Sequence, residues 1–135
     1  MKVVVHVDGG ARGNPGPAAA AAVLTDAETG AELASATEYL GETTNNVAEY
    51  RGLLLGLARA RELGADAVEV VNDSELVAKQ VNGEYKVKHP DMKALHAEAL
   101  KALSAFAKWS IRSVPRAQNA DADALVNQTL DAQVL

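Results

Sequence analysis

The strongest constraint on the fold is a change in the spacing of apolar residues about a third of the way along the chain. Before that point, short apolar runs alternate with residues that favour turns. Runs of this kind, joined by short connections, predict three strands in an antiparallel meander. The predicted strands are 1–8, 18–25 and 32–39, separated by a Gly- and Pro-rich loop at 9–17 and a turn at 26–30.

The chain then changes to a helical spacing. Within Asn45–Leu63, apolar side chains recur every three or four residues, which predicts a long helix. Thr44 or Asn45 would cap its start, and Gly64 would end it. The elements predicted after it are a strand at 67–72, a helix at 74–81, an irregular basic loop at 82–90, a helix at 92–106, a strand at 109–114 and a helix at 119–130.

This order predicts an α/β fold: a five-stranded mixed sheet, with three antiparallel strands followed by two parallel ones, flanked by helices. The 135 residues, 48% of them hydrophobic, match the usual size of one globular domain, expected to span 1–135. The absence of cysteine excludes disulfides and thiolate metal sites and favours a reducing compartment, the cytoplasm. The apolar run before Asp8 is too short for a signal peptide or a membrane span, so no membrane partner is expected.

The net charge of −5 argues at first against a nucleic-acid partner, because Lys and Arg usually make the phosphate contacts. Carboxylates gathered in one metal site would inflate the acidic count, however. Two bound divalent cations would reduce the net charge from −5 to −1. The overall charge therefore does not exclude a nucleic acid.

Four acidic residues occur at or near the ends of predicted elements. Asp8 closes the first strand, and Glu49 lies in the first turns of the long helix. Asp73 follows the strand at 67–72, and Asp123 lies early in the last helix. Because such ends converge on one crevice in open α/β sheets, these carboxylates are expected to meet. A cluster of this kind would repel itself without hard divalent cations such as Mg²⁺, and neither Cys nor paired His is present for zinc.

Each acid also has a structural interpretation, and taken singly that is the commoner role. Asp8 with Gly9 suits an ordinary turn, and Asp73 suits a helix cap. Glu49 would be stabilised in a first turn by the helix dipole, by ~0.3–1 kcal/mol. Asp123 suits a solvated surface. The surrounding motifs favour the functional interpretation of all four together.

Four motifs occur in the chain in a specific order. They are VDGGARGNPGPA at 7–18, TTNNVAEY at 43–50, NDSELV at 72–77, and VPRAQN followed by ADALVN within 114–127. In order and spacing they resemble type 1 ribonuclease H, most closely its compact bacterial and archaeal members, over essentially the whole chain. The resemblance implies a ribonuclease H-like fold and hydrolysis of the RNA strand of an RNA/DNA hybrid by a two-metal mechanism, leaving 5′-phosphate and 3′-hydroxyl ends.

The resemblance assigns the catalytic and metal-binding roles to Asp8, Glu49, Asp73 and Asp123. They would hold two Mg²⁺ ions, with Mn²⁺ as an alternative: Asp8 between them, Glu49 and Asp73 at one, and Asp123 more loosely at the other. Asp121 competes with Asp123, but residues two apart on a helix point about 200° away from each other, so only one can face the site. The family's spacing favours Asp123 and leaves Asp121 exposed.

RNA differs from DNA by its 2′-hydroxyl, which donates and accepts and therefore suits amide side chains. By resemblance, Asn14, Asn45 and Asn46 are the candidates to contact it, and Thr44 is a candidate phosphate ligand for the DNA strand. The structural alternatives are that Asn14 shapes the Pro-Gly loop and that Asn45 or Thr44 caps the helix.

The chain also departs from the family pattern. Some relatives carry a long basic protrusion where this chain has a short loop from Gly83 to Met92, which implies weaker hybrid binding. Many place a flexible His near the last acid, whereas this chain offers Arg116, Gln118 and Asn119. Arg116 could act through its charge but not as a general base. The loop 84–89 and Lys79 are weak candidates for backbone contacts. Trp109 is expected to be a core residue.

Two other functions stay open: a hybrid-binding module that does not cleave, and a DNA-directed nuclease of the same fold. A nucleotide-binding fold is disfavoured, because residues 9–16 match neither G-x-G-x-x-G nor a phosphate loop that ends in Gly-Lys-Ser/Thr. The protein is expected to be a monomer. Related domains are also found fused to a phosphatase-like domain, so this chain is a candidate part of a longer protein.

Overall fold

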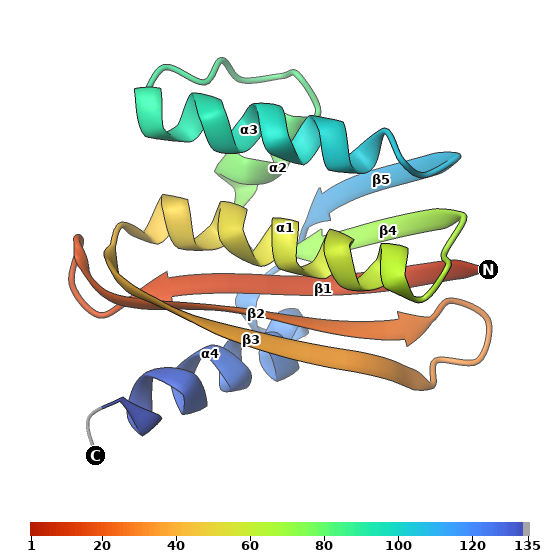
Figure 1. Ribbon diagram of the computed structural model, residues 1–135, viewed down its shortest axis with the longest axis horizontal. Coiled ribbons are helices and arrows are strands. Elements are labelled where there is room, and N and C mark those ends of the chain that lie inside the picture. Colours follow the sequence, from red (N-terminus) through yellow and green to blue (C-terminus); the bar gives the residue numbers. More distant parts are fainter. Residues whose placement is uncertain (134–135) are drawn as a thin grey trace.

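The computed structural model describes residues 1–133, in which helices cover both faces of one mixed sheet. Figure 1 shows α1, α2 and α3 on one face of the sheet and α4 on the other. No helix within the described residues is long and apolar enough to cross a membrane. The elements are β1 (Lys2–Ala11), β2 (Gly16–Asp26), β3 (Glu32–Thr43), α1 (Asn45–Glu62), β4 (Ala67–Asn72), α2 (Glu75–Val81), α3 (Pro90–Leu103), β5 (Lys108–Ser113), the 3₁₀ helix η1 (Arg116–Asn119) and α4 (Ala120–Ala132).

The strand order is β3-β2-β1-β4-β5. β2 pairs antiparallel with both β1 and β3, whereas β4 pairs parallel with both β1 and β5. The predicted fold class, with three antiparallel strands followed by two parallel ones, is therefore confirmed. β1 lies at the centre, where the antiparallel and parallel halves join.

The loop predicted at 9–17 is wrong at both ends. β1 continues to Ala11 and β2 already starts at Gly16, so only residues 12–15 form the connection. Gly9 pairs with Ala20, and Ala11 pairs with Ala18. The Gly and Pro residues suggested a loop, but the glycines extend the strand at a place where another element comes very close.

Several helix boundaries also differ from the sequence prediction. Thr44, not Asn45, caps α1, and Ser74 caps α2 instead of starting it. Helix α3 begins earlier than predicted, because Pro90 suits the first helical turn and His89 caps it. It ends at Leu103, so Phe106 lies beyond it, although this side chain is buried as predicted.

Helix α1 packs directly on the backbone of β1. A Cβ on Gly52 would lie 2.5 Å from the carbonyl oxygen of Asp8. A Cβ on Gly56 would lie 2.6 Å from a methyl group of Val5. These glycines therefore allow a contact that any side chain would prevent. The larger core around this contact is formed by apolar side chains of β1, β4, β5 and the three upper helices, among them Val3, Val7, Leu53, Leu57, Val70, Leu103 and Ile111.

Helix α4 covers the opposite face through a much smaller apolar cluster. Ala19 and Ala21 of β2 pack against Val126 and Leu130 of α4. An ion pair of 2.7 Å between Arg12 and an oxygen of Asp131 joins the β1–β2 connection to the C-terminal half of this helix. Helix α4 is therefore held on the sheet by a smaller apolar cluster than the three helices on the other face, together with this ion pair.

We predict that Gly52→Ala destabilises the protein by about 1–3 kcal/mol, because the added methyl group must displace the backbone of β1. Alanine otherwise favours a helix interior over glycine by up to about 1 kcal/mol, so the expected sign is opposite to that of helix propensity alone. Urea unfolding measures the effect. Ala58→Gly, at an exposed position of the same helix, calibrates the propensity difference. A Gly52→Ala protein as stable as the wild type would contradict the close contact.

Candidate active site

The candidate site begins where β1 and β4 separate. Their parallel ladder ends at the pair His6–Val71. Beyond this pair, the segments that continue from the two strands carry Asp8 and Asp73 into a crevice. Asn72 shapes the turn at Asp73: its Oδ1 accepts from the backbone N–H of Ser74 at 2.7 Å. The two strands thus deliver two carboxylates to the same edge of the sheet.

Glu49 arrives from α1, which crosses β1 at this edge. A Cβ on Gly9 would overlap the backbone of Ala48, so only glycine allows α1 to come this close. Because Glu49 follows Ala48, the crossing brings its side chain beside Asp8. Gly9, which follows Asp8 in the first motif, is therefore required for the close packing of α1 on β1.

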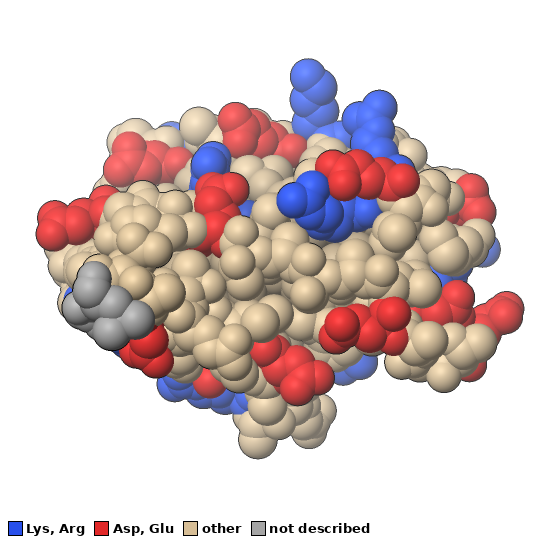
Figure 2. Space-filling view, turned by 60° about the horizontal axis from the view of Figure 1, so that its bottom comes forward, with Lys and Arg blue, Asp and Glu red and all other residues tan. Residues whose placement is uncertain are grey.

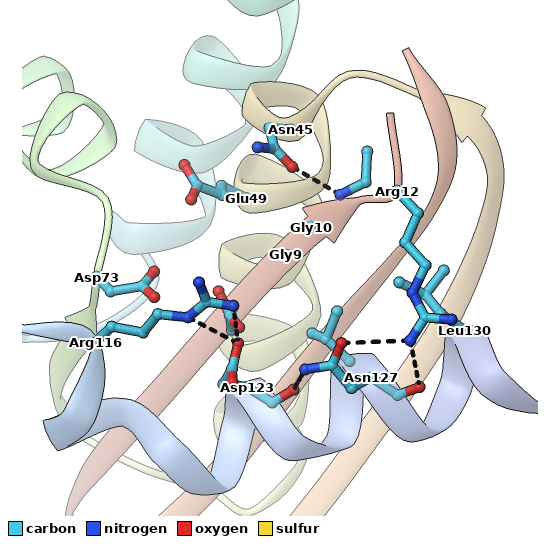
Figure 3. Close-up of a pocket in the computed structure, with 13 residues that line it drawn as sticks. Gly9, Gly10, Arg12, Asn45, Glu49, Asp73, Arg116, Asp123, Asn127 and Leu130 are labelled. Atoms are coloured by element: carbon cyan, nitrogen blue, oxygen red, sulfur yellow. Dashed lines mark hydrogen bonds and ion pairs between the residues drawn. The ribbon is translucent and has the colours of Figure 1, made fainter. Parts of the chain in front are cut away.

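Three of the four predicted acids form one tight group. Carboxylate oxygens of Asp8, Glu49 and Asp73 lie within 4.8 Å of one another. Asp123 lines the same pocket, of about 340 Å³, but does not belong to this group. Figure 3 shows Glu49, Asp73 and Asp123 directed into the pocket from three different elements. The structure thus brings together all four acids, three of them closely.

Burial and mutual repulsion shift the pKa values of two of these acids. Burial, followed by the charge of Asp73, raises the pKa of Asp8 to about 8. Burial also raises the pKa of Glu49 to about 7; a hydrogen bond with Ser74 opposes this shift and the charge of Asp73 adds to it. The carboxylates therefore resist full ionisation at neutral pH without a compensating positive charge.

The positive charge of Arg116 compensates the negative charge of Asp123, the fourth acid. Its guanidinium donates to Oδ1 of Asp123 at 2.9 Å from one nitrogen and 3.3 Å from another. The hydrogen bond and charge of Asp123 raise the pKa of Arg116 above its usual value. Asp121, in contrast, is exposed and does not line the pocket, as the family's spacing predicted.

The donor set of the close group fits a divalent cation. It consists of carboxylate oxygens alone, and the chain has no cysteine. Hard cations prefer oxygen ligands, and a positive charge among the three carboxylates would offset the burial and repulsion that raise the pKa values of Asp8 and Glu49. Asp8, Glu49 and Asp73 are therefore the residues that could hold a metal ion, with Asp123 at the side of the pocket.

The predicted substrate residues have structural roles at the start of α1. Oδ1 of Asn45 accepts from the backbone N–H of Ala11 at 2.7 Å, and Oδ1 of Asn14 accepts from the backbone N–H of Asn45 at 3.2 Å. Thr44 caps the helix by accepting from the backbone N–H of Val47. Within residues 1–133, the side-chain NH₂ groups of Asn14 and Asn45 donate no hydrogen bond. Asn46 is exposed and lies outside the pocket lining.

Lys79 forms an ion pair of 2.6 Å with Glu75 and lies over the ring of Tyr85; its contact with a hybrid backbone stays a prediction. One expectation needs correction. Trp109, expected in the core, is 37% exposed. It lies near the start of β5, an edge strand that has a neighbour on one side only.

Sequence reasoning also missed two residues of the pocket. Arg12 donates to the backbone and side-chain oxygens of Asn127 at 3.4 and 3.5 Å. Asn127 in turn donates to the carbonyl of Asp123 at 3.1 Å. Both residues lie inside the quoted motifs, which was the available signal. Their mutual contact joins segments 115 positions apart and has no local sequence pattern.

Comparison with known proteins identifies the family. Residues 6–129 match the family described as reverse transcriptase-like. The structure also superposes on the RNase H1 of the halophilic archaeon Halobacterium salinarum NRC-1 with a TM-score of 0.95, at 42% identity, over 98% of this chain and 99% of that one. This chain belongs to the type 1 ribonuclease H family. The resemblance found in the four motifs is thereby confirmed.

Other ribonuclease H structures agree. The N-terminal RNase H domain of Rv2228c from Mycobacterium tuberculosis has a TM-score of 0.95 and 48% identity, over 98% of this chain and 95% of that one. LC11-RNase H1 in complex with an RNA/DNA hybrid has a TM-score of 0.92 and 41% identity, over 98% and 99% of the two chains. The full bifunctional protein Rv2228c of strain H37Rv is 48% identical over 132 residues. This chain spans only 36% of that relative's length.

The raised pKa values predict that the metal-free ribonuclease H fold loses stability as the pH rises. An acid with a higher pKa in the folded than in the unfolded state binds more protons when folded, so ionisation between the two values favours unfolding. The unfolded values lie near 4, and the folded values are about 8 for Asp8 and about 7 for Glu49. The melting temperature in EDTA should therefore fall between about pH 5 and about pH 8.5.

Two variants test which acid causes this fall of the melting temperature with pH. Asp8→Asn removes the strongly shifted acid and should flatten the fall, whereas Asp121→Asn, at an exposed position, should keep it. Saturating Mg²⁺ should restore most of the lost stability at the higher pH, because the cation binds the ionised carboxylates of the folded state. Equal slopes in EDTA for the wild type and Asp8→Asn would rule out the buried acid as the cause.

Proposed function

We propose that this chain is an endoribonuclease that cleaves the RNA strand of RNA/DNA hybrids. The observation that carries the proposal is the group formed by Asp8, Glu49 and Asp73, with carboxylate oxygens within 4.8 Å of one another at the base of an open pocket. A relative at 41% identity has been solved in complex with an RNA/DNA hybrid, which supports the substrate class.

The four acids have distinct roles in this proposal. Asp8, the most buried, lies within reach of both Glu49 and Asp73 and would be shared by two cations, whereas Asp123 would serve the second one. Mg²⁺ is the preferred ion because all the donors are hard oxygens, and Mn²⁺ is an alternative. When bound, such a pair of ions activates a water molecule and stabilises the departing oxygen, which leaves 5′-phosphate and 3′-hydroxyl ends.

Positive side chains of the pocket would hold the RNA backbone. Arg116 and Arg12 both line it, and Figure 3 shows them on opposite sides of Asp123 and Asn127. Two fixed guanidinium groups would position phosphates on either side of the carboxylates. The face that carries α4 and β3 is different: Figure 2 shows its charged side chains around a broad uncharged centre. With two divalent cations beside its four carboxylates and two guanidinium groups, the pocket would suit a polyanion.

The amide groups near the start of α1 would recognise RNA. The Oδ1 atoms of Asn14 and Asn45 are engaged within the protein, which leaves their NH₂ groups to donate to a 2′-hydroxyl. Asn46 and Thr44 lie beside them at the same helix start, where the positive end of the helix dipole favours a phosphate of the DNA strand.

The proposal covers the ribonuclease H region, which we take as one domain over residues 1–135, acting as a monomer in the cytoplasm. The bifunctional relative is a longer protein, which supports a longer context for domains of this kind. A phosphatase-like partner domain stays a prediction.

Cleavage of an end-labelled RNA/DNA hybrid tests the activity. Single-stranded RNA, double-stranded RNA and double-stranded DNA are assayed beside it, with Mg²⁺, Mn²⁺ or EDTA. The proposal predicts metal-dependent cleavage of hybrid RNA alone, with a loss of at least ~100-fold in Asp73→Asn. Hybrid binding without cleavage in every metal would leave a binding module, and cleavage of duplex DNA would indicate a DNA-directed nuclease.

Two neighbouring acids provide a matched pair of variants. Asp123→Asn and Asp121→Asn make the same charge change two positions apart on α4, but only Asp123 lines the pocket. Asp123→Asn should reduce the cleavage rate at least ~10-fold, and Asp121→Asn should leave it within about two-fold. Equal losses would show that net charge, and not ligand geometry, controls the rate.

Recognition of the 2′-hydroxyl is tested by Asn45→Asp, which keeps the acceptor for Ala11 and removes the NH₂ donor. The loss of one hydrogen bond, ~0.5–1.5 kcal/mol, should reduce kcat/KM roughly three- to ten-fold. Hybrids with single 2′-deoxy substitutions complete a double-mutant cycle. If Asn45 contacts a given 2′-hydroxyl, the two losses are not additive at that position. Additive losses at every position would exclude this contact.

A further inference from the structure

Asn119 is a buried amide that the catalytic arrangement does not use. It lies where η1 meets α4 and is 1% exposed. It does not line the acidic pocket; it lines a neighbouring cavity. Any effect of Asn119 on the acids must therefore pass through other residues.

The side chain of Asn119 does not perform the task that its position favours. Asparagine at the N-cap usually accepts a hydrogen bond from the first turn of its own helix, but here no such bond is formed. Its Nδ2 instead donates to the carbonyl oxygen of Val7 at 2.8 Å, across 112 positions of sequence. The carbonyl can only accept, so the partner fixes which end of the amide faces β1.

This arrangement leaves the other end of the amide without a partner. Oδ1 of Asn119 is buried and accepts no hydrogen bond from the described residues. Buried acceptors are normally satisfied, and leaving one unpaired opposes folding. Both the missing cap and the unpaired oxygen therefore favour a role for Asn119 other than stabilising the fold.

The two ends of the Val7 hydrogen bond lie next to two of the acids. Val7 precedes Asp8 on β1, just past the last pair of the β1–β4 ladder. Asp123 lies four residues after Asn119, one helical turn further along the same face of α4. The bond therefore joins the backbone that carries Asp8 to the helix that carries Asp123.

Helix α4 packs on the sheet through a small apolar cluster near its middle and C-terminal half, and Ala122 is buried in its first turn. The hydrogen bond of Asn119 adds a directional contact at this N-terminal end. Arg12 holds the distal part of the helix through Asp131. At the N-terminal end of α4, the side chain of Asn119 makes a hydrogen bond to the sheet, through the carbonyl oxygen of Val7 in β1. We propose that Asn119 is a positioning residue that sets the placement of Asp123 relative to Asp8 and thereby the affinity of the site for divalent cations. This inference rests on the proposed metal-binding role of the two acids.

The test measures Mn²⁺ binding to the hybrid-free protein by isothermal titration calorimetry. Asn119→Leu has nearly the same shape and removes both the donor and the unpaired acceptor of the amide. It leaves the carbonyl oxygen of Val7 without its donor, so a loss of stability is expected in a protein that still folds. The positioning role predicts about ten-fold weaker Mn²⁺ binding in at least one binding step, the size typical of residues behind a metal ligand. Gln118→Ala, an exposed amide in the same turn, should bind as the wild type does.

Asn119→Ala repeats the test with a smaller side chain, in case the branched leucine does not pack. Thermal melting in EDTA identifies which variants are folded. Wild-type Mn²⁺ affinity in either folded variant would overturn the inference. If both variants were unfolded in EDTA, Asn119 would be a stability residue and the inference would also fail.

The metal titration separates this inference from the proposed activity. If the wild type cleaves no hybrid but Asn119→Leu binds Mn²⁺ more weakly, the activity proposal fails and the positioning role stands. If the wild type cleaves the hybrid and Asn119→Leu binds Mn²⁺ normally, only the positioning role fails. In an active enzyme, Asn119→Leu should also need about ten-fold more metal for half-maximal rate while KM for the hybrid stays unchanged.

Discussion

Helix α1 rests on the backbone of β1, with no side chain between them at Gly9 and Gly52. This contact places Glu49 against Asp8 and removes both from bulk water. Burial in turn raises the pKa values of these acids, so the same packing that builds the acidic group makes it unfavourable as a set of charges. The demand for a cation therefore follows directly from how closely a helix and a strand approach.

The rest of the fold holds the four acids in place by different means on the two faces of the sheet. Three helices and the larger core fix Asp8, Glu49 and Asp73 on one side of the sheet. Asp123 comes from α4 on the other side, where the apolar cluster is small and polar contacts made by Arg12 and Asn119 hold the helix. Three acids are thus placed by the larger core, and the fourth by a smaller apolar cluster together with hydrogen bonds and ion pairs.

Much of the fold could be predicted because its signals are local. The three- and four-residue spacing of α1 and the β-type runs before it depend on neighbouring positions only, and they gave the correct order of elements. The four acids and Arg116 were found through motifs; helical geometry showed that only one of Asp121 and Asp123 could face the site, and the family's spacing selected Asp123. Glycine misled the prediction at Gly9–Ala11, since its absent side chain suits a loop as well as a close packing contact.

Other features could not be predicted because they depend on distant segments. The contacts of Arg12 with Asn127 and Asp131, and the bond from Asn119 to Val7, join the two ends of the chain and leave no periodic trace in the sequence. The exposure of Trp109 follows from the edge position of β5, which is a property of the whole sheet. Side-chain orientation at such places requires the assembled fold.

The most direct test of this account is the position of bound metal in crystals grown with Mn²⁺, located by anomalous scattering. The account predicts a strong anomalous peak in contact with carboxylate oxygens of Asp8, Glu49 and Asp73, with Asp123 nearest to any second peak. Peaks only elsewhere on the protein, with the three carboxylates free of metal at saturating Mn²⁺, would contradict it.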